Sequence, residues 1–116
     1  MTIARQRLGK AGEDVAVQEL ERRGYEILER RYRTARGEID IVAQDGDTLV
    51  FIEVKVRDTG ECGTAAEAVT RHKQKRLGRM AAEYLVHRKI REQPCRFDVV
   101  AIDAGIVTVY MNAFCL

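Results

Sequence analysis

Three charged side chains in the stretch from Gly37 to Arg57 are candidates for chemistry: two carboxylic acids and one amine. Asp40 lies in the first of two β-branched runs, and Glu53 and Lys55 lie in the second. Asp45-Gly46-Asp47 joins the two runs, which is typical of a β-hairpin. Charged groups on strands this apolar are costly unless they are paired, hydrogen-bonded or bound to metal. We therefore expect a functional site in this hairpin.

The register of the hairpin decides whether the two acids meet. A type II′ turn at Gly46-Asp47 sets Asp45 opposite Thr48. Counting outward from that pair places Asp40 opposite Glu53, with the Cβ atoms about 4.5–5.5 Å apart. Two opposed carboxylates repel each other, and a divalent metal ion between them removes the conflict.

The alternative is a ladder of ion pairs on a solvated face, with Glu38 opposite Lys55. The second run argues against such a face. Its even positions from Val50 to Val56 are all apolar, and Leu49 and Phe51 extend the apolar character to the other side. A strand of this kind is expected to be central and covered on both faces.

The spacing of these residues resembles the core of a nuclease superfamily. Asp40, then a dozen residues, then Glu53-Val54-Lys55 resembles the Asp…Glu-x-Lys motif of the PD-(D/E)xK, or restriction-endonuclease-like, enzymes. The segments that extend this likeness are Gly12-Glu13, Gly24-Tyr25, Gly37-Glu38-Ile39-Asp40, Phe51-Ile52, Glu67-Ala68-Val69, Arg76-Leu77, Tyr84-Leu85 and Arg96-Phe97-Asp98-Val99-Val100. Over nearly its whole length the chain resembles the bacterial YraN-type family, and it is similar to archaeal Holliday-junction resolvases. Val56 departs from the pattern, where a polar or aromatic residue is expected.

The resemblance implies metal-dependent hydrolysis of phosphodiester bonds. Asp40 and Glu53 offer hard oxygen ligands for Mg²⁺ or Mn²⁺, and the backbone carbonyl of Val54 adds a third. Lys55 would orient the attacking water or stabilise the charged transition state.

Glu13 is a further candidate ligand, on the first predicted helix. From the residues alone, a surface acid that pairs with Lys10 is the stronger interpretation. The resemblance reverses this, because related resolvases use an acid from this helix. Glu13 would then complete the metal shell directly or through a water molecule.

The length and composition predict one globular domain, residues 1–116. A chain of 116 residues can bury one core but not two. No apolar run approaches the ~20 residues that a membrane span needs, and the first residues lack the apolar segment of a secretory signal. Cys62, Cys95 and Cys115 show no CxxC spacing, so we expect free thiols in the reducing cytoplasm.

The net charge of +2 is too small to indicate a nucleic-acid partner, but its distribution is informative. Residues 71–91 carry eight Lys or Arg and one acid, and a second basic segment precedes the hairpin. A basic helix beside an acidic pocket suits a polyanion, although charge alone leaves a solvated basic face equally open.

Lys73 occupies a position on the apolar stripe of the second predicted helix, so we expect its amine to point at an anionic group. His72 and His87 lack ligand spacing. The predicted nucleic-acid-binding residues are Lys73, Gln74, Lys75, Arg76, Arg79, Arg33 and Arg36.

The hydrophobic periodicities predict the element order αβββαββ around a mixed β-sheet, with a crossover helix between the parallel strands. With the resemblance, this is an α/β fold of the restriction-endonuclease-like class, a mixed central sheet flanked by helices. Segment 58–64 is predicted to be a loop that contacts the substrate. The predicted helices are Arg5–Arg23 and Ala65–Ile90, and the strands are Tyr25–Tyr32, the two hairpin runs, Arg96–Ile102 and Ile106–Met111.

We therefore expect a metal-dependent endonuclease that acts on DNA, including branched or damaged DNA. The alternative is a DNA-binding or scaffold module that keeps the fold but does not cut. A weaker third interpretation is a phosphodiesterase that acts on RNA or a nucleotide. A homodimer is left open by the sequence.

Overall fold

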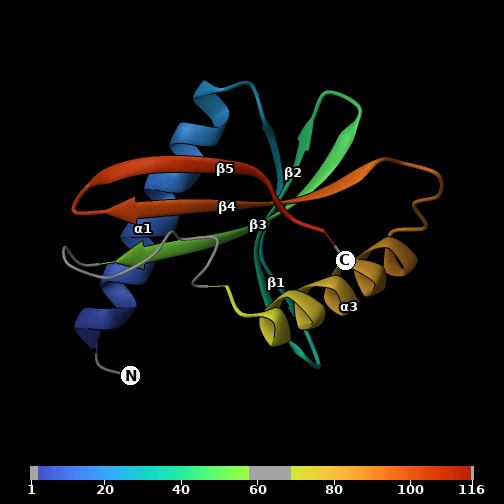
Figure 1. The fold of residues 1–116 in the computed structure, drawn as a ribbon, viewed down its shortest axis with the longest axis horizontal. Helices are drawn as coiled ribbons and strands as arrows, with labels where there is room; N and C mark the ends of the chain where they lie inside the picture. The colour runs from blue at the N-terminus through green and yellow to red at the C-terminus, as the bar shows by residue number, and fades with distance from the viewer. Residues whose placement is uncertain (1–2, 58–68, 116) are drawn as a thin grey trace.

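The computed structural model of the chain describes residues 3–57 and 69–115, with side chains from Ala11 onward. Figure 1 shows two helices packed against opposite faces of one sheet. The elements are α1 (Ile3–Arg22), β1 (Glu26–Thr34), β2 (Gly37–Asp45), β3 (Thr48–Arg57), α3 (Arg71–His87), β4 (Cys95–Asp103) and β5 (Ile106–Phe114). The predicted order αβββαββ is confirmed.

The sheet has five strands in the order β1-β2-β3-β4-β5. Neighbouring strands are antiparallel except β3 and β4, which are parallel from Leu49↔Cys95 to Arg57↔Asp103. The connection between these two strands contains α3, so the predicted crossover helix is confirmed. The result is the predicted mixed α/β architecture, compatible with the restriction-endonuclease-like arrangement.

Each face of the sheet carries its own apolar cluster. On the α3 side, Phe51 of β3 packs with Leu77 and Tyr84. On the α1 side, Val50 and Ile52 of β3 pack in the same cluster as Leu20. Strand β3 is therefore buried from both sides, as its uneven pattern predicted. Burial of this kind contributes about 1.5–3 kcal/mol per large apolar side chain.

Helix α1 comes unusually close to β3 at Gly12. A Cβ atom at this position would lie 2.5 Å from Cγ2 of Val56. Only glycine permits that approach, which places the following residue, Glu13, directly over the sheet. The helix then ends before Gly24, whose φ of +94° is the left-handed conformation that a glycine directly after a helix favours.

The largest boundary difference is at the start of α3. The helix was predicted from Ala65 to Ile90, but Val69 and Thr70 are not helical and the helix runs from Arg71 to His87. Thr70 is its N-cap, because the Thr70 side chain accepts a hydrogen bond from the backbone N–H of Lys73. Residues 65–68 and the predicted substrate loop 58–64 lie outside the described residues.

No helix in the described part of the chain is long and apolar enough to cross a membrane. Cys95 and Cys115 are free thiols, as predicted, and Cys62 lies outside the described residues. The first and last strands extend further than predicted, to Thr34 and to Phe114.

Candidate functional site

The two predicted ligand acids lie at the end of the hairpin that is remote from its turn. Gly46 has φ of +61° and Asp47 is not at positive φ, so the turn is of the predicted II′ type. Asp45 pairs with Thr48, and the ladder continues in constant register to Ile41↔Ile52. The predicted register is confirmed over these pairs. The predicted pairing of Asp40 with Glu53 lies one step beyond them, where β2 and β3 no longer form backbone pairs.

The backbone pairing of β2 with β3 stops where the site begins. The backbone N–H of Val54 donates to Oδ2 of Asp40 at 2.8 Å, so a side-chain carboxylate takes a backbone donor. The side-chain alternation also breaks here. Ile39 packs on the α3 side, whereas Ile41 and Ala43 pack on the α1 side. The period-two alternation of the first hairpin run predicts that Ile39, Ile41 and Ala43 share one face, and this prediction is wrong at Ile39.

Glu53 is buried beneath α3, with 7% of its surface exposed. Its Oε1 forms an ion pair with Nζ of Lys73, whose side chain is 30% exposed. A buried carboxylate without a partner is costly, and Lys73 supplies the compensating charge. The prediction that Lys73 points at an anionic group is confirmed, and the group is Glu53.

The electrostatics of the site are centred on Asp40. Burial and then the nearby Glu53 carboxylate raise the pKa of Asp40 from 3.8 to about 7. The hydrogen bond from Val54 and the charge of Lys73 oppose this rise, whereas Glu13 adds to it. The two acids therefore sit close enough that ionising both is unfavourable. A bound cation would reverse that preference.

Glu13 is held by two arginines of β1. It is 6% exposed, and its two carboxylate oxygens accept from Nε of Arg30 at 2.9 Å and from Nε of Arg31 at 3.0 Å. Arg31 has φ of +54° and lies between the pairs that β1 forms with Ile39 and Ile41, so it stands opposite Asp40. The Glu13 carboxylate thus lies close enough to Asp40 to raise its pKa, but Glu13 already has two cationic partners.

Lys55 follows Glu53 by two residues along β3 and is partly buried. Within the described residues no carboxylate lies at ion-pair distance from Lys55, so its amine remains available. Its expected neighbour across the hairpin, Glu38, pairs instead with Nε of Arg33 at 3.3 Å. An ion-pair ladder between Glu38 and Lys55 is therefore not formed.

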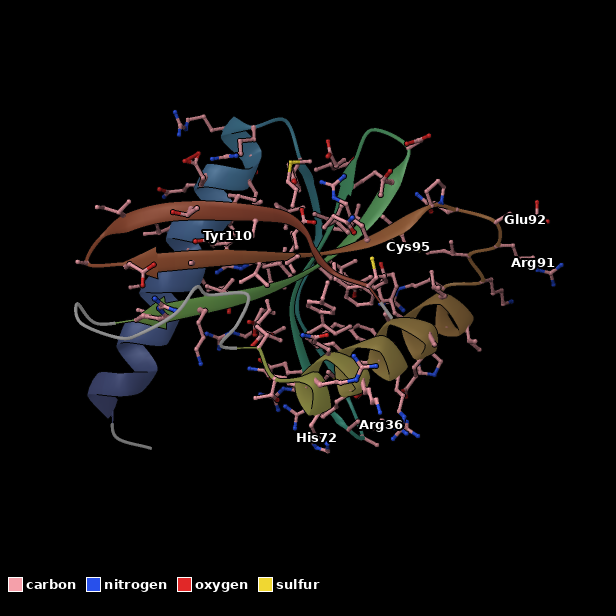
Figure 2. All side chains as sticks on the ribbon, viewed as in Figure 1. Arg36, His72, Arg91, Glu92, Cys95 and Tyr110 are labelled. Atoms are coloured by element: carbon pink, nitrogen blue, oxygen red, sulfur yellow. The ribbon has the colours of Figure 1, made fainter. Side chains whose placement is uncertain are left out.

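Four of the predicted nucleic-acid contacts converge on a hollow of about 310 Å³ beside α3. We call it the basic hollow; it is lined by Arg36, His72, Lys75, Arg76 and Arg79. Figure 2 shows Arg36 and His72 close together at the outer side of α3. The sequence interpretation did not include His72. The signal that could have found it is the helical spacing of residues 72, 75, 76 and 79.

The other predicted contacts do not line the basic hollow. The Lys73 amine is paired with Glu53, and Nε2 of Gln74 donates to the Val69 carbonyl at 3.0 Å. Arg33 pairs with Glu38. The structure therefore places four of the seven predicted residues at the basic hollow and the other three away from it.

A buried polar network at the other end of the sheet was not predicted. Asp98 is 1% exposed and accepts from the Tyr25 hydroxyl at 2.9 Å and from Nε of Arg96 at 2.9 Å. The Asn112 backbone N–H donates to it at 2.9 Å, and Arg96 Nη2 also reaches Asp45 at 2.7 Å. This network ties the residue before β1 to β4, β5 and the end of β2 at the hairpin turn. In the sequence, Tyr25, Arg96 and Asp98 were noted only as segments of the family resemblance, with no structural role assigned.

The donor set fits a hard divalent ion bound through two carboxylates. Within the described residues there is no group of three or more acids, histidines or cysteines arranged to hold a metal ion. Asp40 and Glu53 nevertheless supply oxygen ligands whose mutual repulsion a cation relieves. Mg²⁺ is commonly held by one or two carboxylates together with water and substrate oxygens. The residues therefore suit Mg²⁺ or Mn²⁺ better than a softer metal.

The fold and site define a small mixed α/β domain with a coupled pair of acids beneath a basic helix. Residues 12–102 match the sequence model described as "Uncharacterised protein family UPF0102", and the chain belongs to this family. The YraN-type prediction is thereby confirmed.

Relatives in several bacteria share about half of their residues with this chain. The UPF0102 protein STH1475 of Symbiobacterium thermophilum is 50% identical over 99 residues, 85% of this chain and 84% of that protein. The UPF0102 protein HEAR0176 of Herminiimonas arsenicoxydans is 48% identical over 110 residues, 95% and 88% of the two chains. A UPF0102 protein of Desulfitobacterium hafniense is 46% identical over 103 residues, 88% and 85% of the two chains.

Proposed function

We propose that this chain is a metal-dependent endonuclease of the restriction-endonuclease-like class that hydrolyses DNA phosphodiester bonds in the cytoplasm. The supporting observation is the placement of Asp40 in a buried position beside Glu53, because burial and then the Glu53 carboxylate raise the pKa of Asp40 to about 7. A pair of acids that disfavour each other's ionisation is destabilising unless it binds a cation. The likeness to Holliday-junction resolvases favours branched or damaged DNA as the substrate.

Each residue of the site has a role in this proposal. Asp40 and Glu53 would hold Mg²⁺ or Mn²⁺, with the Val54 carbonyl and Glu13 completing the shell directly or through water. When bound, the ion supplies an activated water and neutralises developing charge. Lys55 extends from the same strand as Glu53 and has no acidic partner in the described part of the chain. Its ammonium can therefore orient the attacking water or donate to the charged transition state.

The basic hollow supports a nucleic-acid substrate. It gathers Arg36, Lys75, Arg76 and Arg79 on the outer side of the helix whose inner side carries Lys73 onto Glu53. A DNA strand bound there would be separated from Asp40 and Glu53 by the width of α3. Contacts of this kind provide affinity that depends on salt and not on sequence.

A non-catalytic DNA-binding module is the second candidate. The observation that favours it is that two of the acids already have cationic partners without metal, Glu53 with Lys73 and Glu13 with Arg30 and Arg31. Such pairing could be the permanent structure of a site that no longer binds metal.

Metal binding and cleavage measured together distinguish these candidates. Linear duplex, single-stranded and four-way DNA would be incubated with the protein and Mg²⁺ or Mn²⁺, while calorimetry follows metal binding. Lys55→Ala is the test variant and Lys89→Ala, an exposed lysine after α3, is the matched control. Cleavage that Lys89→Ala retains and Lys55→Ala loses supports the nuclease. Binding of DNA without cleavage of any form, and without metal uptake, supports the module.

A further inference from the structure

The basic hollow brings together side chains from two elements. His72, Lys75, Arg76 and Arg79 lie on the exposed side of α3, and Arg36 lies in the turn between β1 and β2. The helical residues follow the spacing i, i+3, i+4 and i+7, which places them on one face. Figure 2 shows Arg36 and His72 projecting from this side, with Arg91 at a distant edge of the molecule.

This concentration of positive charge is only weakly compensated. Within the described residues, no acid forms an ion pair with the four helical members of the hollow. Only Arg36 approaches an acid, with Nη1 3.7 Å from Oε2 of Glu83, which is longer than a charge-assisted hydrogen bond. Like charges three or four residues apart destabilise a helix. The arrangement therefore costs stability unless an anion binds.

The direction of α3 adds to this field. The first turn of the helix contains no acidic residue, although acids are favoured there. The helix N-terminus carries about +0.5 elementary charge, and His72 lies in that first turn, whereas the cations Lys75, Arg76 and Arg79 follow in the next turns. The dipole therefore adds positive potential at the His72 end of the hollow.

The shape and charge of the hollow favour a compact, highly charged anion. Its volume of about 310 Å³ leaves room for a phosphate group and part of its nucleotide. A phosphodiester carries a single negative charge, whereas a phosphate monoester carries about −1.5 to −2 at pH 7. Four permanent cations around one concave site match the monoester better than a diester in a continuous backbone.

We infer that the basic hollow binds the terminal phosphate monoester of a nucleic-acid strand. This rests on the proposed function only in taking a nucleic acid as the substrate. Lys73 connects the two regions, because its amine contacts Glu53 on the inner side while His72 and Arg76 of the same helix line the hollow outside. The hollow would thereby anchor a strand end near the acids.

Binding of end-labelled oligonucleotides tests the inference without any need for cleavage. Fluorescence anisotropy would compare one single-stranded sequence carrying a 5′-phosphate, a 3′-phosphate or hydroxyls at both ends, in EDTA. The variants are Lys75→Gln, Arg79→Gln and the double variant, with Arg91→Gln as a control of equal charge change on an exposed arginine elsewhere. Inorganic phosphate serves as the competitor.

We expect the wild type and Arg91→Gln to bind one of the phosphorylated strands at least tenfold more tightly than the hydroxyl strand. The double variant should reduce that ratio to about one, and inorganic phosphate should lower it in the wild type. Equal affinity for all three ends, a preference that the double variant retains, or no binding of any strand would overturn the inference. Cleavage without end preference would leave the nuclease proposal standing, and end preference without cleavage would leave the terminal-phosphate site standing.

Discussion

Replacing Asp40 by asparagine should stabilise the metal-free protein above neutral pH. The substitution removes the charge but leaves an oxygen that can accept the Val54 N–H. The pKa of Asp40 rises from 3.8 to about 7, about three units at about 1.4 kcal/mol per unit, which sets an upper limit of about 4 kcal/mol. Partial exposure and solvent screening reduce this, so we expect a gain of about 1–3 kcal/mol at pH 8.

The sign of the pH dependence follows from the raised pKa. The unfolded chain ionises Asp40 near pH 4 and the folded chain near pH 7, so the native state binds more protons between these values. Stability contributed by this group therefore falls as pH rises from 4 to 7, and the penalty is complete above 7. The advantage of Asp40→Asn should be largest at pH 8 and should disappear near pH 4.

Thermal unfolding in EDTA at pH 4, 5.5 and 8 measures this, at roughly 4 °C per kcal/mol for a chain of this size. Asp47→Asn, which changes an exposed acid in the hairpin turn, is the matched control and should show little change. Added Mn²⁺ should raise the Tm of the wild type and have less effect on Asp40→Asn. The reasoning is refuted if Asp40→Asn is less stable than the wild type at pH 8, or if its gain is the same at every pH.

Three further changes test other parts of the molecule. Lys55→Ala should keep Mn²⁺ and DNA binding near wild type while cleavage falls at least 100-fold, ~2.7 kcal/mol of transition-state stabilisation; lost metal affinity would instead make Lys55 structural. Lys75→Gln with Arg79→Gln should reduce the slope of log K against log salt by up to ~1.8 for duplex DNA, and an unchanged slope would place the interface elsewhere. Gly12→Ala should lower stability by about 1–3 kcal/mol because its Cβ meets Val56, and Val56→Ala in the same chain should recover part of the loss.

The sequence predicted the fold well because its signals are local. The type II′ turn and the period-two pattern together determine the hairpin register, and a one-residue slip would have moved the acids to opposite faces. The left-handed Gly24 likewise follows from its place after a helix. The start of α3 was missed because the apolar pattern continues through Val69, which is buried without being helical. Thr70 as an N-cap residue was the available signal.

The sequence predicted which strand and helix positions carry the candidate site residues, but not which side chains those residues contact. The partners of Glu13 depend on how α1 packs over β1 and on the left-handed conformation of Arg31, which no sequence rule indicates. The sequence predicted that Lys73 pairs with an anionic group, because a lysine on an apolar stripe needs one. It did not identify Glu53 as that group. The Asp98 network was missed because its members are distant in sequence and meet only through tertiary packing.

The hydrogen bond from Val54 to Asp40 gives the molecule an internal reporter. Most amides of β3 donate to backbone carbonyls, whose character does not change with pH or ligands. The Val54 amide donates to a carboxylate that protonation, substitution or a bound ion would alter. Its proton and nitrogen resonances should therefore move with the state of Asp40, while ladder amides such as those of Val50 and Ile52 stay nearly fixed. A single backbone amide on a central strand thus allows occupancy of the acid pair to be followed by NMR in solution, without a substrate and without turnover.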